Sequence, residues 1–200
     1  MLAIYFFQLS LSCISLIMLP LLKAVFLAFS FEFVLASPAP RAMVVHERLE
    51  TIPSRFVHNG AAPPTQVLYL RLALVQSDRA GLEDALMAVS TPGDAQYGQF
   101  LSKEEVEAFV APSQETSDAV TRFLSDNGLT ASKVTPAGDW LSINVTVVQA
   151  NELFAAQFDS FIDNSTGETT VRTLEYSIPT DLKGHLDFVH PTIACVQYVS

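Results

Sequence analysis

Two histidines flank an aspartate near the end of the chain, in the order His185-x-Asp187-x-x-His190. Imidazole nitrogens and carboxylate oxygens are ligands that zinc and similar ions accept in proteins. The spacing matches none of the strong metal-ligand patterns, and a surface linker that happens to contain two histidines is the commoner explanation. We therefore predict no metal site in this chain, and we find no motif for another cofactor.

The residue patterns required for hydrolytic catalysis are missing from the sequence. A hydrolase needs an activated nucleophile, its base and a pocket that stabilises developing charge. None of the eight glycines is followed two positions later by serine, so the sequence has no nucleophile elbow. The carboxylate pairs Glu83-Asp84 and Glu104-Glu105 are typical of the first turn of a helix, where the macrodipole favours negative charge. We expect the chain as given not to be an enzyme.

Two sequons for N-linked glycosylation are present, Asn144-Val145-Thr146 and Asn164-Ser165-Thr166. Asn164 falls in a predicted turn, which makes it the better acceptor. Asn144 falls in a predicted strand and needs the face that carries Trp140 to be open to solvent. We predict glycosylation at Asn144 and Asn164; the alternative at either position is an unmodified polar residue.

The charge balance argues against nucleic acid as a partner. The net charge is −10, and the 11 Lys and Arg residues form no basic patch along the sequence. Binding to phosphate backbones depends on clustered cations, so we exclude nucleic-acid binding.

Residues 1–36 form an apolar head in which only Lys23 and Glu32 are charged. A secretory signal needs a basic start, a short apolar stretch and small residues at its cleavage site. Met18 is a better start than Met1, because Lys23 then supplies the charge in front of the apolar run.

Small residues at the end of the head complete the signal-peptide layout. We predict translation from Met18, cleavage between Ala36 and Ser37, and a secreted, extracellular chain that has no membrane contact after cleavage. The alternative is a membrane anchor, since the whole head exceeds the roughly 20 residues that span a bilayer.

Hydrophobic periodicity and capping residues predict an alternation of strands and helices. Ser102 and Glu105 form a capping box, Asp78 caps an earlier helix, and Asn127-Gly128 ends a later one. The predicted strands are 67–75, 129–135 and 139–147, the predicted helices are 79–89, 103–110, 113–127 and 149–157, and a hairpin joins 158–162 to 170–176.

This order of elements predicts an α+β fold, a ferredoxin-like antiparallel sheet with helices on one face. We predict four regions in the chain. They are a signal peptide at 1–36, an N-terminal arm at 37–65, the main domain at 66–180, and a linker with an atypical tail at 181–200.

An ordered series of short motifs runs through the main domain. The motifs are Tyr97-Gly98 with Leu101-Ser102, Gly138-Asp139-Trp140, Arg172-Thr173 with Tyr176-Ser177 and Pro179, and His185-x-Asp187 with Pro191-Thr192. From about Val44 to Thr192 the series resembles the activation propeptide of sedolisin-type serine-carboxyl peptidases, the pro-kumamolisin activation domain, in the fungal tripeptidyl-peptidase-like form.

The resemblance implies a subtilisin-propeptide-like domain whose antiparallel sheet packs on a cognate sedolisin peptidase domain. In this family the propeptide assists folding of the peptidase, holds its cleft shut and is released by acid. The outer sheet face would then be the interface, and the segment after Ser177 would lead towards the partner's cleft. Calcium would belong to the catalytic domain, not to this chain.

Acid release implies groups that change charge near neutral pH, as histidine does. His58, His185 and His190 are the candidates by position. The alternative for each is an ordinary solvated histidine.

The sequence departs from the family pattern after Thr192, where residues 193–200 include no processing linker and no Gly-Thr-Ser nucleophile motif. Three interpretations remain open: a fragment of a secreted acid peptidase precursor, a free-standing inhibitor that acts in trans, and an unrelated secreted binding module.

Overall fold

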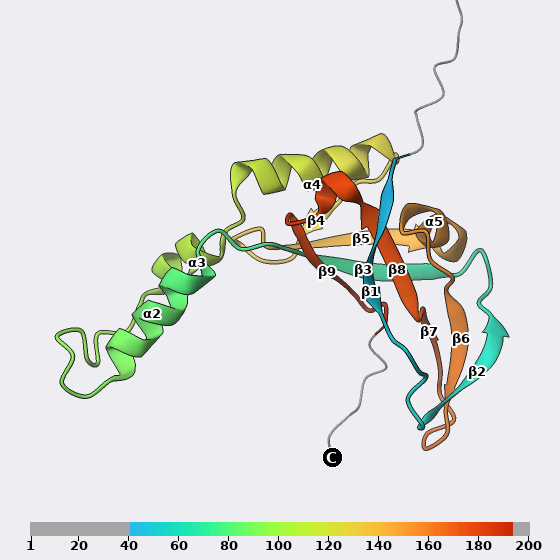
Figure 1. Ribbon diagram of the computed structural model, residues 1–200, viewed down its shortest axis with the longest axis horizontal. Helices are drawn as coiled ribbons and strands as arrows, with labels where there is room; N and C mark the ends of the chain where they lie inside the picture. Colours follow the sequence, from blue (N-terminus) through green and yellow to red (C-terminus); the bar gives the residue numbers. More distant parts are fainter. Residues whose placement is uncertain (1–40, 194–200) are drawn as a thin grey trace, which may run out of the picture. The chain divides into compact units, whose positions relative to one another are not determined.

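The computed structural model describes residues 41–193 (Figure 1). The predicted signal peptide, with its start at Met18 and its cleavage between Ala36 and Ser37, lies outside the described residues, as does the tail from 194 onwards. Within residues 41–193 no helix has the length and apolar character that crossing a membrane requires.

The strands are β1 (Met43–Arg48), β2 (Phe56–Ala61), β3 (Val67–Leu74), β4 (Ser132–Lys133), β5 (Trp140–Thr146), β6 (Asp159–Asp163), β7 (Thr169–Arg172), β8 (Glu175–Pro179) and β9 (Leu186–His190). The helices are α2 (Arg79–Ser90), α3 (Lys103–Val110), α4 (Gln114–Asp126) and α5 (Val147–Leu153), with a 3-10 turn η1 (Thr180–Leu182). The predicted α+β class with antiparallel sheets is confirmed.

A four-stranded antiparallel sheet in the order β4-β5-β3-β9 is the centre of the domain. Strand β3 alternates: Leu68, Leu70 and Leu72 are buried, whereas Tyr69 and Arg71 are exposed. Because side chains of a strand point alternately to opposite faces, the buried leucines mark an inner face and the exposed residues an outer one.

The inner face packs against helices α4 and α5 and strand β8 in one hydrophobic core. Its largest fully buried side chains include Leu70, Ile143, Phe154 and Tyr176. Figure 1 shows α4 running along the sheet beside β4 and β5, with β1 and β8 crossing β3. Burying each large apolar side chain stabilises the fold by about 1.5–3 kcal/mol.

Two smaller sheets accompany the central one, so the strands do not lie in the single sheet that the element order suggested. One pairs β1 with β8, and the other has the order β2-β6-β7. The cause is a break at Thr173 and Leu174, which divides the predicted strand 170–176 into β7 and β8. The Thr173 hydroxyl donates to the carbonyl of Glu175 across this break.

The first and last parts of the described residues contain strands that the sequence did not predict clearly. The predicted arm at 37–65 contains β1 and β2, which pair with β8 and β6. The predicted linker at 181–200 contains β9, which pairs with β3. These short strands have no period-2 pattern of their own and are held by the strands they border.

Helix starts follow the capping residues. The Ser102 hydroxyl accepts from the Glu105 N–H, and the Glu105 carboxylate accepts from the Ser102 N–H, which confirms the predicted capping box. This bonding also lowers the pKa of Glu105, with the Ser102 backbone N–H as the largest cause. A second capping box, Thr146 with Gln149, starts α5 at Val147, so the predicted helix 149–157 lies too far along the chain.

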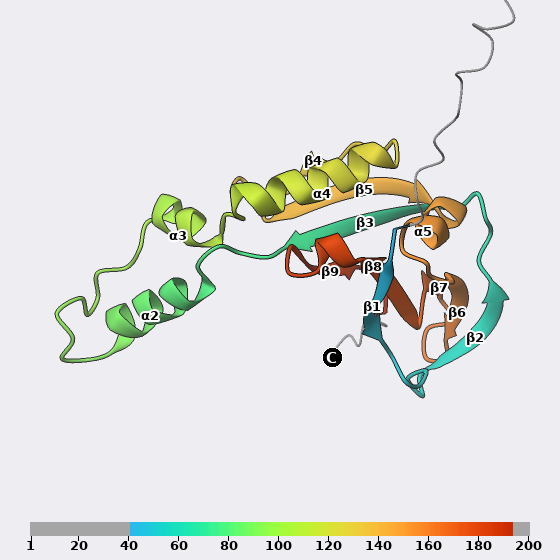
Figure 2. The ribbon, with the colours of Figure 1, turned by 45° about the horizontal axis from the view of Figure 1, so that its top comes forward.

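Helices α2 and α3 form an arm, residues 79–110 with the loop between them, that contributes no side chain to the core cluster. Figures 1 and 2 both show these helices apart from the sheets, at the end of the segments that leave β3 and enter α4. Residues 91–100 are exposed throughout, and Phe100 is the most exposed large apolar side chain, at 78%.

Candidate functional site

The outer face of the central sheet keeps Val67, Tyr69 and Asn144 exposed, and no helix within residues 41–193 buries them. Its positions come from β3, β5 and β9, paired in register: Tyr69 with Asn144, Ala73 with Trp140 and Phe188, and Arg71 with Ser142 and His190. Tyr69 is 70% exposed. We call this set of residues the open sheet face; its members are Val67, Tyr69, Arg71, Ala73, Trp140, Ser142, Asn144, Thr146, Phe188 and His190.

Two aromatic rings brace one end of the open sheet face. Trp140 and Phe188 meet edge to face, with 5.3 Å between ring centroids and 82° between planes. Between them Ala73 is 5% exposed, although it lies on the outer face. Edge-to-face pairs of this kind are stabilising beyond their buried area, so this end of the face is pre-formed.

His190 lies beside Arg71 on neighbouring strands of the open sheet face. Burial lowers the pKa of His190, and the charges of Arg172 and Arg71 lower it further. The surroundings of this imidazole are therefore electropositive and disfavour its protonation.

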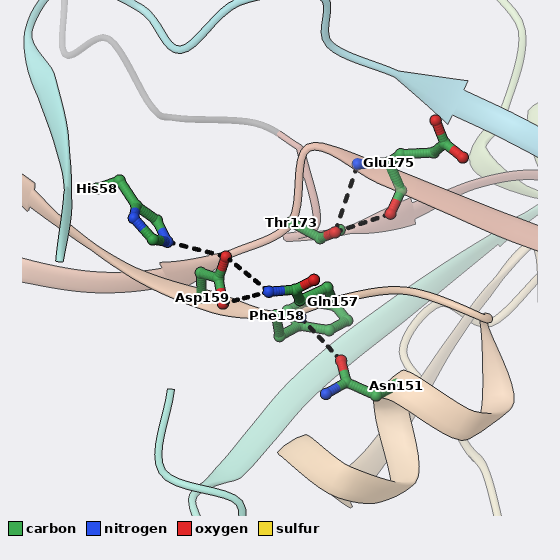
Figure 3. Close-up of polar contacts among 7 residues, drawn as sticks. All are labelled: His58, Asn151, Gln157, Phe158, Asp159, Thr173 and Glu175. Carbon is green, nitrogen blue, oxygen red and sulfur yellow. Dashed lines mark hydrogen bonds and ion pairs between the residues drawn. The ribbon is translucent and has the colours of Figure 1, made fainter. Parts of the chain in front are cut away.

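His58 lies on β2, in the three-stranded sheet, and not on the open sheet face. Its Nε2 is 2.9 Å from Asp159 Oδ2, and Gln157 Nε2 donates to both oxygens of the same carboxylate at 3.4 Å (Figure 3). The ring also packs edge-on against Phe161, with centroids 5.5 Å apart. Protonation of His58 would complete an ion pair that joins β2 to β6.

His185 precedes β9 and faces helix α4. Its Nδ1 shares a hydrogen bond of 2.9 Å with Thr116 Oγ1, and the Ser113 hydroxyl donates to the same oxygen at 3.0 Å. His185 thus joins the last part of the domain to the first turn of α4.

The three histidines do not form one cluster, since they contact three different partners. The metal-like pattern of His185, Asp187 and His190 is likewise not gathered into a site. Among residues 41–193 no group of three His, Cys, Asp or Glu side chains is placed to hold a metal ion.

The two sequon asparagines are exposed but differ in position. Asn164 lies in the turn between β6 and β7, where its N–H donates to the carbonyl of Arg55 at 2.9 Å. Asn144 lies on the open sheet face opposite Tyr69. A glycan on Asn144 would occupy this face, whereas one on Asn164 would not.

A polar link under β9 was not anticipated from the sequence. The buried Tyr176 hydroxyl donates to Glu47 at 2.5 Å and accepts from the N–H of Val189 at 3.0 Å. His46 Nε2 donates to the carbonyl of Asp187 at 2.7 Å, and its ring lies 5.6 Å from that of Tyr176. Tyr176 and His46 thus form hydrogen bonds with backbone groups of β9 that β3 does not reach. In the sequence, only the presence of a tyrosine in an apolar strand could have indicated this link.

Comparison of the sequence with known proteins identifies a family and several relatives. Residues 54–195 match the family model of the pro-kumamolisin activation domain. The chain is 34% identical over 158 residues to a probable tripeptidyl-peptidase SED2 of Trichophyton verrucosum, covering 78% of this chain and 26% of that protein. It is 31% identical over 166 residues to tripeptidyl-peptidase sed1 of Aspergillus fumigatus, covering 82% and 26%.

A third relative is aorsin of Aspergillus oryzae, 34% identical over 152 residues, with coverage of 75% of this chain and 23% of that protein. The chain thus spans about a quarter of the length of these relatives. The matched residues include the whole central sheet and both helices that cover it. The chain therefore belongs to the pro-kumamolisin activation domain family, the propeptide family of sedolisin-type peptidases.

Proposed function

We propose that this chain is the activation propeptide of a secreted acid serine-carboxyl peptidase of the tripeptidyl-peptidase type. It assists folding of the peptidase domain and inhibits it until acid releases the complex. The observation that carries this proposal is the family match over residues 54–195, which covers all but the first strand of the described domain.

The open sheet face is the part of the domain suited to the peptidase. It combines exposed Tyr69 with the pre-formed Trp140 and Phe188 pair, and aromatic side chains on a rigid support are typical centres of protein interfaces. Strand β9 borders this face and is the last element before the chain leaves the described domain. The following residues would lead towards the peptidase cleft.

Acid release comes from protonation of carboxylates and histidines paired across the interface, and His58, His185 and His190 are the histidine candidates. Protonation of His190 is opposed by burial and by two arginines, whereas His58 and His185 contact Asp159 and Thr116. An alternative is that all three are ordinary solvated histidines. Replacing all three and finding the same release pH would decide for that alternative.

Export of the chain follows from the same proposal. The head at 1–36 would be removed between Ala36 and Ser37, and Asn164 would receive a glycan during passage through the secretory pathway. Sequencing the transcript across the codon for Thr192 tests whether a peptidase domain is encoded in the same frame.

Binding to mature peptidases is the direct test of the function. The secreted chain is titrated at pH 7 and pH 4 against the mature enzymes of three relatives, SED2, sed1 and aorsin. We expect binding and inhibition that weaken at pH 4. The Leu70→Asp variant, which places a charge in the fully buried core, is the unfolded control. A chain that is folded by circular dichroism and binds none of the three contradicts the proposal.

A further inference from the structure

Five of the ten Lys and Arg side chains in residues 41–193 form ion pairs with carboxylates of the same chain. Ion pairs join Arg41 to Asp126, Arg48 to Glu175, Arg55 to Asp163, Arg79 to Glu83 and Lys103 to Glu107. Arg71, on the open sheet face, has no ion-pair partner among residues 41–193. The exposed Arg122, Lys133 and Lys183 share this property among residues 41–193, but of these four cations only Arg71 lies on the open sheet face.

The open sheet face itself contains no acidic residue. None of its ten positions is Asp or Glu, although acidic residues outnumber basic ones by 21 to 11 in the chain. Asp187 is exposed at the register shift of β9, directly before Phe188, and is the one acidic residue of the three strands that supply the face. The face is therefore weakly basic on an otherwise acidic molecule.

Two groups of this face, one cationic and one titratable, are neighbours in register. His190 is paired in register with Arg71, and Arg172 is close enough to act on the same imidazole. No carboxylate of residues 41–193 forms an ion pair with Arg71. A partner carboxylate placed beside Arg71 would therefore supply the missing negative charge. Arginine is also the residue best suited to bidentate pairing with a carboxylate.

We propose that the open sheet face recognises an acidic patch on the peptidase domain, with partner carboxylates bound by Arg71 and His190 and a neighbouring apolar contact on Trp140, Phe188 and Tyr69. This inference rests on the proposed function and specifies the chemistry of the partner. Electrostatic complementarity of this kind sets the partner choice and the association rate, while the aromatic contact supplies buried area. Phosphate-rich partners fit poorly, because the face has too few cations for them.

The test compares two charge reversals that alter the net charge equally. Arg71→Glu reverses the cation on the open sheet face, and Arg122→Glu reverses an exposed cation of helix α4, which packs on the inner face of the sheet. Arg71→Gln is added in case the reversal impairs folding. Affinity for the same mature peptidases is measured at pH 7 in low and high salt.

We expect Arg71→Glu to weaken binding by about tenfold or more and Arg71→Gln by less, both with a flatter salt dependence. Arg122→Glu should stay within about twofold of the unaltered chain. Nuclear magnetic resonance titration should also find the His190 pKa higher in the complex than in the free chain, since a carboxylate favours imidazolium. Protonation of His190 therefore strengthens this contact, and the contact is lost at pH 4 only when the partner carboxylates themselves are protonated.

Two outcomes overturn the inference while leaving the proposed function intact. In one, the chain binds the peptidases but Arg71→Glu and Arg122→Glu have equal effects. In the other, the complex leaves the His190 pKa unchanged and the salt dependence is the same for all variants. If the unaltered chain binds no peptidase, the proposed function fails with it.

Discussion

At the scale of single residues, Tyr176 joins three strands through one buried hydroxyl. This hydroxyl donates to Glu47 of β1 and accepts from the N–H of Val189 of β9, while its own residue lies in β8. Burial and the bond to Glu47 raise the pKa of Tyr176 far above its usual range, so the hydroxyl stays a neutral donor.

Tyr176→Phe should lower the free energy of unfolding by about 1–3 kcal/mol, because it leaves the buried N–H of Val189 without its acceptor. Urea denaturation at neutral pH measures the difference. Tyr69→Phe is the matched control, since Tyr69 is exposed and its change should stay within about 0.5 kcal/mol. Equal losses for both variants would contradict the assigned role of the buried hydroxyl.

His190 should make the domain less stable in mild acid. Its pKa is lowered in the folded chain by burial, Arg172 and Arg71, so the folded state binds fewer protons than the unfolded state. Stability then falls as the pH drops below about 6.5, the ordinary histidine value. His190→Gln should remove this part of the loss.

The measurement is the urea midpoint of the unaltered chain and of His190→Gln at pH 8 and pH 5. At pH 8 the imidazole is neutral in both states, so the pH 8 comparison isolates any packing effect of the substitution. An identical drop between pH 8 and pH 5 for both chains would show that His190 does not contribute.

At the scale of elements, capping residues predicted helices better than periodicity predicted strands. Helix α3 has the predicted bounds 103–110, because Ser102 and Glu105 fix its first turn locally. Strand β9 was assigned to a linker, because Leu186–His190 alternates imperfectly and pairs with residues over a hundred positions earlier. Local capping contacts could be predicted from the sequence, whereas pairing between distant strands could not.

The candidate site was predictable only in part, for the same reason. The outward pattern of Trp140, Ser142, Asn144 and Thr146 was visible in the sequence as strict alternation. The addition of Phe188 and His190 to that face depends on β9 and could not be seen. The hydrogen bonds from Tyr176 and His46 to the free edge of β9 could not be predicted either, because they form only when three distant segments meet.

The positions of the two sequons predict unequal glycosylation. Asn164 lies in the exposed β6–β7 turn and should be occupied in the secreted chain. The sequon alone predicts a glycan at Asn144 as well, but docking of the open sheet face during folding of the precursor would require Asn144 to be largely unoccupied, because a glycan there would block the contact. Mass spectrometry of tryptic glycopeptides measures both occupancies. Asn164→Gln should remove the glycan without changing peptidase binding, whereas a fully glycosylated Asn144 would exclude docking through this face.

At the scale of the whole molecule, the domain divides into a core and a detachable arm. The core cluster draws on β3, β5, β8, β9, α4 and α5 but on no residue of the arm at 79–110. The two ends of the arm are already joined at its base. The Ser77 N–H donates to the carbonyl of Ala111 and the Asp78 N–H to that of Phe109, each at 3.1 Å. Removing the arm therefore takes no side chain from the core cluster that packs on the central sheet.

This division predicts that the arm can be excised without unfolding the core. Replacing residues 78–110 by Asn-Gly would connect Ser77 to Ala111 through a two-residue turn, a length that joins antiparallel segments readily. The free energy of unfolding should change by no more than about 1 kcal/mol, since the excision spares the core cluster and loop shortening has a small entropic effect.

Urea denaturation followed by circular dichroism measures this change in the free energy of unfolding, with Leu70→Ala as the destabilised control, expected to lose about 2–5 kcal/mol. Loss of cooperative unfolding in the excised chain would mean that the arm supports the sheet through contacts outside the core. If the excised chain unfolds cooperatively, its affinity for the peptidases then reports whether the open sheet face suffices for docking or the exposed side chains of the arm also take part.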